Sequence, residues 1–200
     1  SPHQKFYQTK NRRRIIVNKY PIIKASHTIG FSGLFNGNYN FSKSKFELIK
    51  RFHFPLIGYS DFELELGKFW GQAPFPLLEI PRANQSLGYQ FKSFNLMNYM
   101  EFINDEYMTV RWNHYFKGFI FNKLPLIKKI KIREVVGFKM LYGRLSDENN
   151  PYKNKNLLQL PIDNQGHPST FLMESKPYLE ASVGITNIFK FFRVDLIKRL

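Results

Sequence analysis

The feature that most constrains this chain is the strict alternation of apolar and polar residues in Asp-Phe-Glu-Leu-Glu-Leu-Gly, residues 61–67. Successive side chains of a β-strand point to opposite faces, so one face of this segment is apolar and the other carries carboxylates. The apolar side chains are Phe62, Leu64 and Leu66, and the carboxylates are Asp61, Glu63 and Glu65. A strand of this kind separates two unlike environments. Its apolar face meets either a protein core or the hydrocarbon of a lipid bilayer.

Similar alternation recurs along the chain and predicts an all-β, antiparallel fold. The predicted strands span residues 23–31, 39–54, 59–70, 106–116, 130–142, 178–184 and 191–200. From the second connection onwards, short turns alternate with two long loops, residues 71–105 and 146–177. Outer-membrane β-barrels show this asymmetry, with short periplasmic turns and long external loops. The pattern therefore favours a transmembrane outer-membrane β-barrel in which both long loops are external.

The number of predicted strands bears on how the chain is organised. A closed spanning barrel needs at least about eight strands, and the sequence predicts seven. We therefore expect residues 21–200 to supply part of a larger barrel, with at least one further strand after this chain. Residues 1–20, which include Arg12, Arg13 and Arg14, are expected to form a basic periplasmic segment.

In a barrel, residues that face lipid alternate with residues that face the lumen along every strand. The predicted lipid-facing residues are Phe62, Leu64, Leu66, Met108, Val110, Trp112, Ile132, Val136, Phe138 and Met140. The predicted charge network of the lumen consists of Lys45, Arg51, Asp61, Glu63, Glu65, Arg111, Lys131, Arg133 and Lys139. We expect its carboxylates to pair with Lys45 and Arg51 of the neighbouring strand, or with basic groups elsewhere on the lumen wall.

Aromatic residues gather at the predicted short turns, as they do at the interfaces of a membrane. Phe52, Phe54 and Tyr59 flank the first turn, Phe116, Phe119 and Phe121 the second, and Phe189, Phe191 and Phe192 the third. We therefore expect outer-membrane lipid, including lipopolysaccharide, to be a partner of the barrel wall.

Composition removes several other classes of protein. No apolar run approaches the roughly 18 residues of a transmembrane helix. The chain has no cysteine for a disulfide, a thiolate metal site or a nucleophile. Its formal net charge of +15 fits a second hypothesis, a soluble basic β-protein that binds nucleic acid or polyanions. The basic residues are spread along the chain without a nucleic-acid motif, so the barrel hypothesis includes no nucleic-acid partner.

The sequence predicts no catalysis, no metal site and no cofactor. The five histidines, His3, His27, His53, His114 and His167, show no metal-binding spacing. Ser26 and His27 are neighbours on one predicted strand, so their side chains point to opposite faces and do not form a hydrolase pair.

Three further segments are residues 94–102 with Asp105, Tyr107 and residues 114–118 downstream, residues 122–129, and residues 177–195. Together they resemble the C-terminal barrel of a Bacteroidota outer-membrane family, in which a carboxypeptidase-regulatory-like domain precedes a barrel of uncharacterised function. The last segment, which ends in Arg193-Val-Asp195, is also similar to the end of the barrel-assembly and two-partner-secretion superfamily. That similarity implies a barrel of about sixteen strands. The Arg-Gly-Phe/Tyr motif of that superfamily's lumen loop does not occur in this chain.

The expected function is that of a structural, assembly or transport component of the Gram-negative outer membrane, without catalysis. Residues 71–105 are rich in Pro, Met and Phe and are too apolar for a free loop. We expect this loop to contact other outer-membrane or surface proteins.

Overall fold

The computed structural model describes residues 6–15, 20–33, 37–162, 165–173 and 175–200, and the structural statements below refer to these residues. Parts of two predicted segments lie outside the described residues. They are residues 1–5 and 16–19 of the basic segment 1–20, and residues 163–164 and 174 of the loop 146–177.

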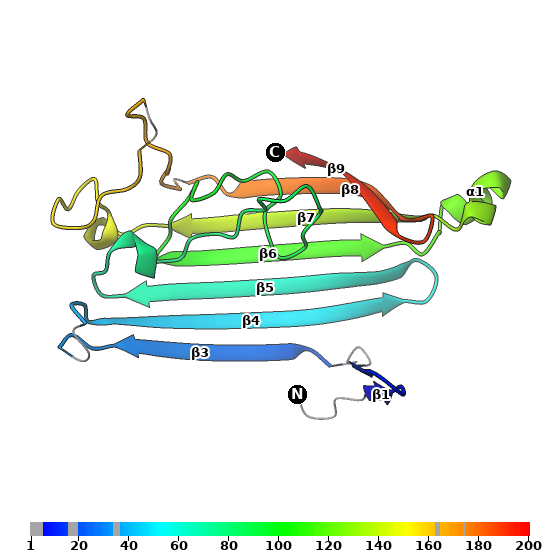
Figure 1. Cartoon of the computed structure of the whole chain (residues 1–200), viewed down its shortest axis with the longest axis horizontal. Helices are drawn as coiled ribbons and strands as arrows, with labels where there is room; N and C mark the ends of the chain where they lie inside the picture. Colours follow the sequence, from blue (N-terminus) through cyan, green and yellow to red (C-terminus); the bar gives the residue numbers. More distant parts are fainter. Residues whose placement is uncertain (1–5, 16–19, 34–36, 163–164, 174) are drawn as a thin grey trace.

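The chain forms an antiparallel sheet of seven strands whose order in the sheet is their order in the sequence (Figure 1). The strands are β3 (Ile22–Gly30), β4 (Phe41–Phe54), β5 (Gly58–Trp70), β6 (Glu106–Tyr115), β7 (Arg133–Arg144), β8 (Tyr178–Ile188) and β9 (Phe192–Arg199). The predicted all-β, antiparallel fold is therefore confirmed. Within the predicted basic segment, β1 (Phe6–Gln8) and β2 (Arg13–Ile15) form a separate two-stranded sheet.

Several of these strands are long. β4 has 14 residues, β5 has 13 and β7 has 12. A strand of a typical globular protein has about five or six residues. At about 3.4 Å per residue, β4 extends over roughly 45 Å. Strict alternation over residues 61–67 favours this length in β5, and no proline lies within β4, β5 or β7 to end them earlier.

The predicted strand 130–142 begins later than expected. The 3-10 turn η3 (Phe121–Lys123) and the short helix α1 (Pro125–Ile130) precede it, and Lys131 has a left-handed φ of 60°. Proline is favoured at the first position of a helix, which explains where α1 begins. Lys131 and Ile132 therefore precede β7, and their predicted positions on the two faces of this strand were wrong.

The connections separate into two groups at opposite ends of the sheet (Figure 1). Residues 55–57, 116–132 and 189–191 connect strands at one end, which we call the short-turn end. Residues 31–40, 71–105 and 145–177 connect strands at the other end, the long-loop end. The 3-10 turns η2 (Phe75–Leu77) and η4 (Asp147–Asn149) lie in the long connections.

The register places side chains of the same kind in rows across the sheet. One row, from β3 to β8, is entirely apolar and consists of Ile23, Leu48, Leu64, Val110, Met140 and Leu179. The adjacent row on the opposite face, from β5 to β9, consists of Glu63, Arg111, Lys139, Glu180 and Arg199. We call the face of the first row the apolar face and that of the second row the polar face.

Burial is inverted relative to a water-soluble sheet. On the polar face, Glu63 is 2% exposed, Arg111 4%, Lys139 3% and Glu180 2%. On the apolar face, Leu66 is 38% exposed, Tyr142 47% and Val183 64%. A soluble sheet with one buried face buries its apolar side chains and exposes its charges. This sheet does the reverse.

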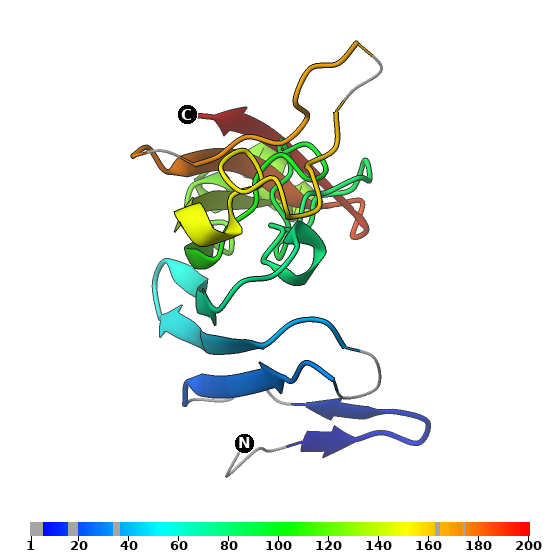
Figure 2. The same cartoon turned by 90° about the vertical axis from the view of Figure 1, so that its left-hand side faces the viewer.

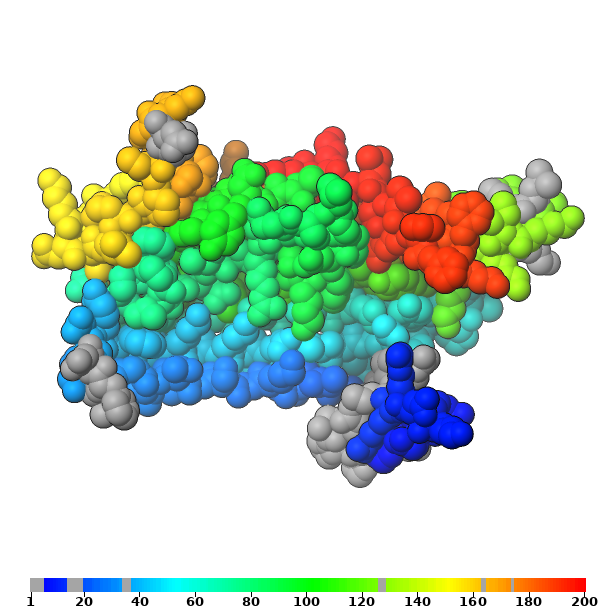
Figure 3. All heavy atoms as spheres, in the orientation of Figure 1, coloured from blue at the N-terminus to red at the C-terminus, as the bar shows by residue number. Residues whose placement is uncertain are grey.

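The polar face is buried because residues 71–105 fold back over it, and we call them the covering segment. Figures 1 and 2 show this segment lying beside the sheet, and Figure 3 shows its atoms over the strands behind it. Phe94, Met97 and Phe102 pack with Leu141 and Tyr178 of the polar face in one apolar cluster. A second cluster contains the buried residues Phe69, Ala73, Leu78, Ile103 and Leu160. The apolar residues that led us to expect a partner contact are thus largely buried within the chain itself.

Candidate functional site

The centre of the polar face is a network of buried ion pairs. Arg111 Nη1 lies 2.8 Å from a Glu63 oxygen and 3.4 Å from a Glu65 oxygen. Lys45 Nζ lies 2.7 Å from Glu65, and the hydroxyl of Tyr107 donates to Glu65 at 3.0 Å. Buried charges are tolerated only when they are paired and hydrogen-bonded, and here each carboxylate has a cation within ion-pair distance. The register of β5 and β6 places Glu63 directly opposite Arg111, and the alternation of each strand keeps both side chains on the polar face.

The network extends to both sides of this centre. Arg51 Nε lies 2.5 Å from Asp61, in the pairing that the sequence analysis expected. Lys92, from the covering segment, lies 3.6 Å from Glu63 and 3.6 Å from Glu47. The covering segment thus contributes a cation of its own to the carboxylates of the sheet.

Lys139 of β7 holds the covering segment through backbone carbonyls. Its ammonium donates to the carbonyl oxygens of Gln90 and Ser93, each at 2.5 Å. The same ammonium lies 4.7 Å from the centre of the Tyr89 ring. A lysine ammonium has three donors and no acceptor, so two carbonyls and an aromatic face are suitable partners for a buried one.

Glu180 of β8 holds the same segment through backbone amides. The amides of Asn95 and Leu96 donate to the two carboxylate oxygens at 2.9 and 2.7 Å, and the Tyr178 hydroxyl donates at 2.8 Å. Hydrogen bonds to an ionised carboxylate are about twice as strong as neutral ones. Lys139 and Glu180 therefore fix residues 90–96 from two neighbouring strands.

Tyr89 is a third attachment point. Its hydroxyl donates to Asn113 Oδ1 at 2.9 Å, and the Arg193 guanidinium lies 3.8 Å from its ring centre. Arg193 in turn donates to both carboxylate oxygens of Asp195, at 2.6 and 2.7 Å. Burial raises the pKa of the Tyr89 hydroxyl, so the hydroxyl stays protonated and remains a donor at neutral pH. The Arg-x-Asp pair found in the sequence thus contacts the covering segment.

A separate polar cluster joins the two long connections. One Asp105 oxygen accepts hydrogen bonds from the amide and the hydroxyl of Ser146 and, at 3.1 Å, from Asn149 Nδ2. Asn149 Oδ1 accepts from the amide of Ala73 at 3.0 Å. This cluster fixes the start and the end of the covering segment at the long-loop end.

Most of the residues predicted for the charge network share the polar face. The register aligns Lys45, Arg51, Asp61, Glu63, Glu65, Arg111 and Lys139 on that face. Arg133, at the first position of β7, lies on the same face and donates to Asn122 Oδ1 at 3.0 Å, whereas Lys131 precedes the strand. The sequence analysis missed Glu47, Lys92, Tyr107, Glu180, Arg193 and Asp195. Glu180 and Asp195 alternate with apolar neighbours in their strands. This alternation could have placed both carboxylates on the polar face from the sequence alone.

The residues predicted to face lipid share the apolar face, except Ile132. They are Phe62, Leu64, Leu66, Met108, Val110, Trp112, Val136, Phe138 and Met140. His114 also lies on this face and is 5% exposed. Its Nε2 lies 2.9 Å from the carbonyl oxygen of Ile57, which accepts, and its Nδ1 lies 2.8 Å from the Ser60 hydroxyl. Both ring nitrogens are therefore satisfied, one by the turn between β4 and β5 and one by β5.

The described charges are arranged to hold chain segments together. Among the described residues, no group of three or more His, Asp or Glu side chains is placed to bind a metal ion. No helix of the described ranges has the length and hydrophobicity that crossing a membrane requires. What the arrangement does is fix a long segment of chain against the polar side of a sheet.

The chain was compared with known proteins. No curated protein and no solved structure matched it. The model of one protein family, described as the C-terminal domain of a family of unknown function, DUF5686, matches residues 1–154. This match covers β1 to β7, the whole covering segment and η4. The chain therefore belongs to the DUF5686 C-terminal domain family.

Proposed function

We propose that this chain forms part of a β-barrel in the outer membrane of a Gram-negative bacterium of the Bacteroidota, with the covering segment lying in the lumen. The observation that carries the proposal is the inverted burial of the sheet. Charged side chains are buried beneath the covering segment, whereas the apolar face leaves residues such as Val183 64% exposed. An apolar face of this extent is costly in water and favourable against hydrocarbon.

The dimensions of the apolar face fit a bilayer. On β5 this face carries no charged side chain from Gly58 to Leu66, about 27 Å along the strand. A transmembrane strand needs about 9–11 residues when it is tilted by roughly 45°. β4, β5 and β7 all exceed this length, with 14, 13 and 12 residues. Their ends beyond the apolar rows carry the charged and aromatic residues that suit a membrane interface.

The edges of the sheet support a larger barrel. Within the described residues, β3 pairs only with β4 and β9 only with β8. The outer edge of each strand therefore presents backbone groups that need partners, and such groups are especially costly in lipid. Further strands of the same barrel would supply these partners. The resemblance described above indicates about sixteen strands in all.

The covered lumen bears on the role of the barrel. The attachments at Tyr89, Lys139 and Glu180 close the polar face rather than leave it open to water. This arrangement supports a structural or assembly component of the cell envelope, and any transport would require the segment to move. Leu87 and Tyr99 of the covering segment remain 109% and 67% exposed. These two side chains are available to contact another outer-membrane or surface protein.

A pair of leucine substitutions tests the proposal. Leu64 lies in the wholly apolar row, and Leu87 is an exposed leucine of the covering segment. An arginine at mid-depth on a lipid-facing strand costs about 2–4 kcal/mol, whereas at an exposed aqueous site it costs within about 0.5 kcal/mol. Leu64→Arg should therefore greatly reduce the heat-modifiable, folded protein recovered from outer membranes. Leu87→Arg should leave it unchanged.

The same experiment distinguishes the membrane barrel from the second hypothesis, a soluble basic β-protein. If both variants are recovered equally and the protein dissolves in salt without detergent, the apolar face does not meet lipid. Retention on heparin would then favour the soluble, basic β-protein that the net charge of +15 permits.

A further inference from the structure

The apolar face ends in a charged row near the long-loop end. The register aligns His27, Ser44, Lys68, Glu106 and Arg144 across β3 to β7. The next row of this face, two residues towards the short-turn end, consists of Ala25, Phe46, Leu66, Met108 and Tyr142. The two rows are about 7 Å apart along the strands. A hollow of about 980 Å³ lies along both rows, and we call it the rim groove.

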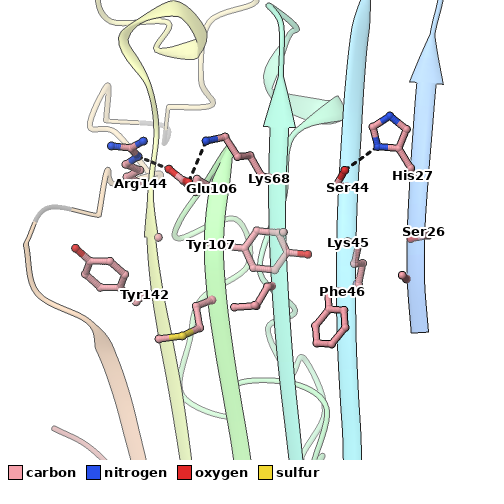
Figure 4. A pocket seen from close by; sticks show the side chains of 15 residues that line it. Ser26, His27, Ser44, Lys45, Phe46, Lys68, Glu106, Tyr107, Tyr142 and Arg144 are labelled. Carbon is pink, nitrogen blue, oxygen red and sulfur yellow. Dashed lines mark hydrogen bonds and ion pairs between the residues drawn. The ribbon is translucent and has the colours of Figure 1, made fainter. Parts of the chain in front are cut away.

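The charged row has more cations than carboxylates. Figure 4 shows Lys68 and Arg144 on either side of Glu106, at 3.2 and 2.5 Å. Among the described contacts, Arg144 uses only its Nε in this pair, and its side chain is 70% exposed. The Lys68 side chain is 44% exposed. One carboxylate balances one of these two cations, so the row keeps a positive surplus with donors that face outward.

The other end of the charged row adds neutral hydrogen-bonding groups. His27 Nδ1 and the Ser44 hydroxyl lie 2.7 Å apart, and Figure 4 shows this pair beside Lys68. Trp70 lies beyond the row, with its ring 6.1 Å from His27 and 5.9 Å from the Lys68 ammonium. An amphipathic indole next to charges is the usual arrangement at the level of lipid headgroups.

We propose that the rim groove binds the phosphate of an anionic membrane lipid, with an acyl chain along Phe46, Leu66 and Met108. This inference rests on the proposed function, because it requires the apolar face to lie in a bilayer. The charge of the groove selects a phosphate that carries no cationic headgroup. Arg144 and Lys68 are suited to such a phosphate, since a guanidinium and an ammonium both donate to its oxygens. The apolar row below favours a lipid over a free phosphate ion.

The two tryptophans of the chain, Trp70 and Trp112, provide a test with separate readouts. Trp112 lies on the apolar face within the proposed membrane band, and Trp70 lies at the rim groove. The full-length protein is reconstituted in phosphatidylcholine vesicles that contain a fixed fraction of a lipid with brominated acyl chains. The brominated lipid is phosphatidic acid in one set of vesicles and phosphatidylcholine in the other. Bromine quenches nearby tryptophan fluorescence. The signal of each residue is the difference between the protein and its Trp70→Phe or Trp112→Phe variant, so tryptophans outside this chain do not enter either signal.

We expect brominated phosphatidic acid to be enriched at Trp70 roughly fivefold over brominated phosphatidylcholine, since a cation near the surface favours an anionic lipid to about this extent. Trp112 should be quenched by both lipids. The double variant Lys68→Gln with Arg144→Gln should lose the preference at Trp70. Glu106→Gln should increase it, because the competing carboxylate is gone. Lys153→Gln removes a cation from an exposed ion pair of the same end and should change nothing.

The outcomes distinguish the two proposals. Quenching of Trp112 without any lipid preference at Trp70 overturns the rim groove and leaves the membrane barrel standing. Absence of quenching at both tryptophans overturns the barrel and the groove together. Loss of the preference on adding excess inorganic phosphate would show a phosphate site without lipid specificity, which also overturns the proposal.

Discussion

At the scale of single residues, close packing on the polar face depends on glycines, which leave room for side chains of the neighbouring strands. Gly137 lies opposite Asn113, and a Cβ added there would be 2.4 Å from Asn113 Oδ1 and 2.5 Å from Ser182 Oγ. Gly67 lies under the ring of Tyr107 in the same way, with a Cβ at 2.1 Å from a ring carbon. The hydrogen bond between Tyr89 and Asn113 therefore requires a glycine on the neighbouring strand.

A substitution at Gly137 tests this requirement. Gly137→Ala should displace the Asn113 amide and weaken the bond to Tyr89, at a cost of about 1–3 kcal/mol. We expect faster hydrogen exchange, or faster proteolysis, in residues 81–100. Gly88→Ala is the matched control in the covering segment, because a Cβ there meets nothing within 4 Å. Equal protection in both variants would show that Tyr89 does not hold the segment.

At the scale of elements, the sequence predicted the strands well and the segments between them poorly. The alternation placed all seven strands of the sheet with at most a few residues of error at either end, because a period of two is specific for strands. Residues 130–132 also look like alternation, but Pro125 starts a helix that carries the chain through Ile130. A short helix of six residues is below the length at which its period can be recognised.

The course of the covering segment could not be predicted from local pattern. Its attachments use backbone groups of Gln90, Ser93 and Asn95, which leave no mark in the sequence. The candidate network was predicted for some pairs on neighbouring strands, such as Arg51 and Asp61. It was missed for Lys92, which lies in a segment without a period, and also for Arg193 and Asp195, which lie on one strand.

The turn between β4 and β5 allows a test at the element scale. Gly58 has a φ of 107°, and a Cβ there would lie 1.8 Å from the backbone oxygen of Tyr115. Gly58→Ala should therefore separate β5 from β6 at this end and markedly lower the urea midpoint of unfolding. Gly33 has a φ of 82°, and no atom of the described residues lies within 4 Å of a Cβ there. Gly33→Ala adds only the backbone strain of about 1–2 kcal/mol. Similar midpoints for the two variants would contradict the close approach at Gly58.

At the scale of the whole molecule, the covering segment decides whether the polar face is accessible. Lys139 and Glu180 are both buried, so removing them takes away charge-assisted hydrogen bonds worth several kcal/mol in total. In the proposed barrel, the double variant Lys139→Met with Glu180→Ala should release residues 90–96. The full-length protein should then conduct ions across a planar lipid bilayer more often than the wild type.

The control for this experiment removes an equal number of charges elsewhere. Lys153 and Asp147 form an exposed ion pair of 2.6 Å in the other long connection. Lys153→Met with Asp147→Ala should leave conductance at the level of the wild type. A folded Lys139 and Glu180 variant that conducts no better than this control would argue against closure of the lumen by the covering segment.

The order of strands in the sheet has a consequence for biogenesis. Every strand from β3 to β9 is hydrogen-bonded to the strand that comes before or after it in the chain, with no crossover. Each hairpin can thus form as soon as its second strand is available, and the sheet can grow by successive addition from one edge. The covering segment departs from this order, since Asn95 contacts a strand 85 residues further along. The sheet can therefore form locally, but its polar face is fully covered only after β8 has joined.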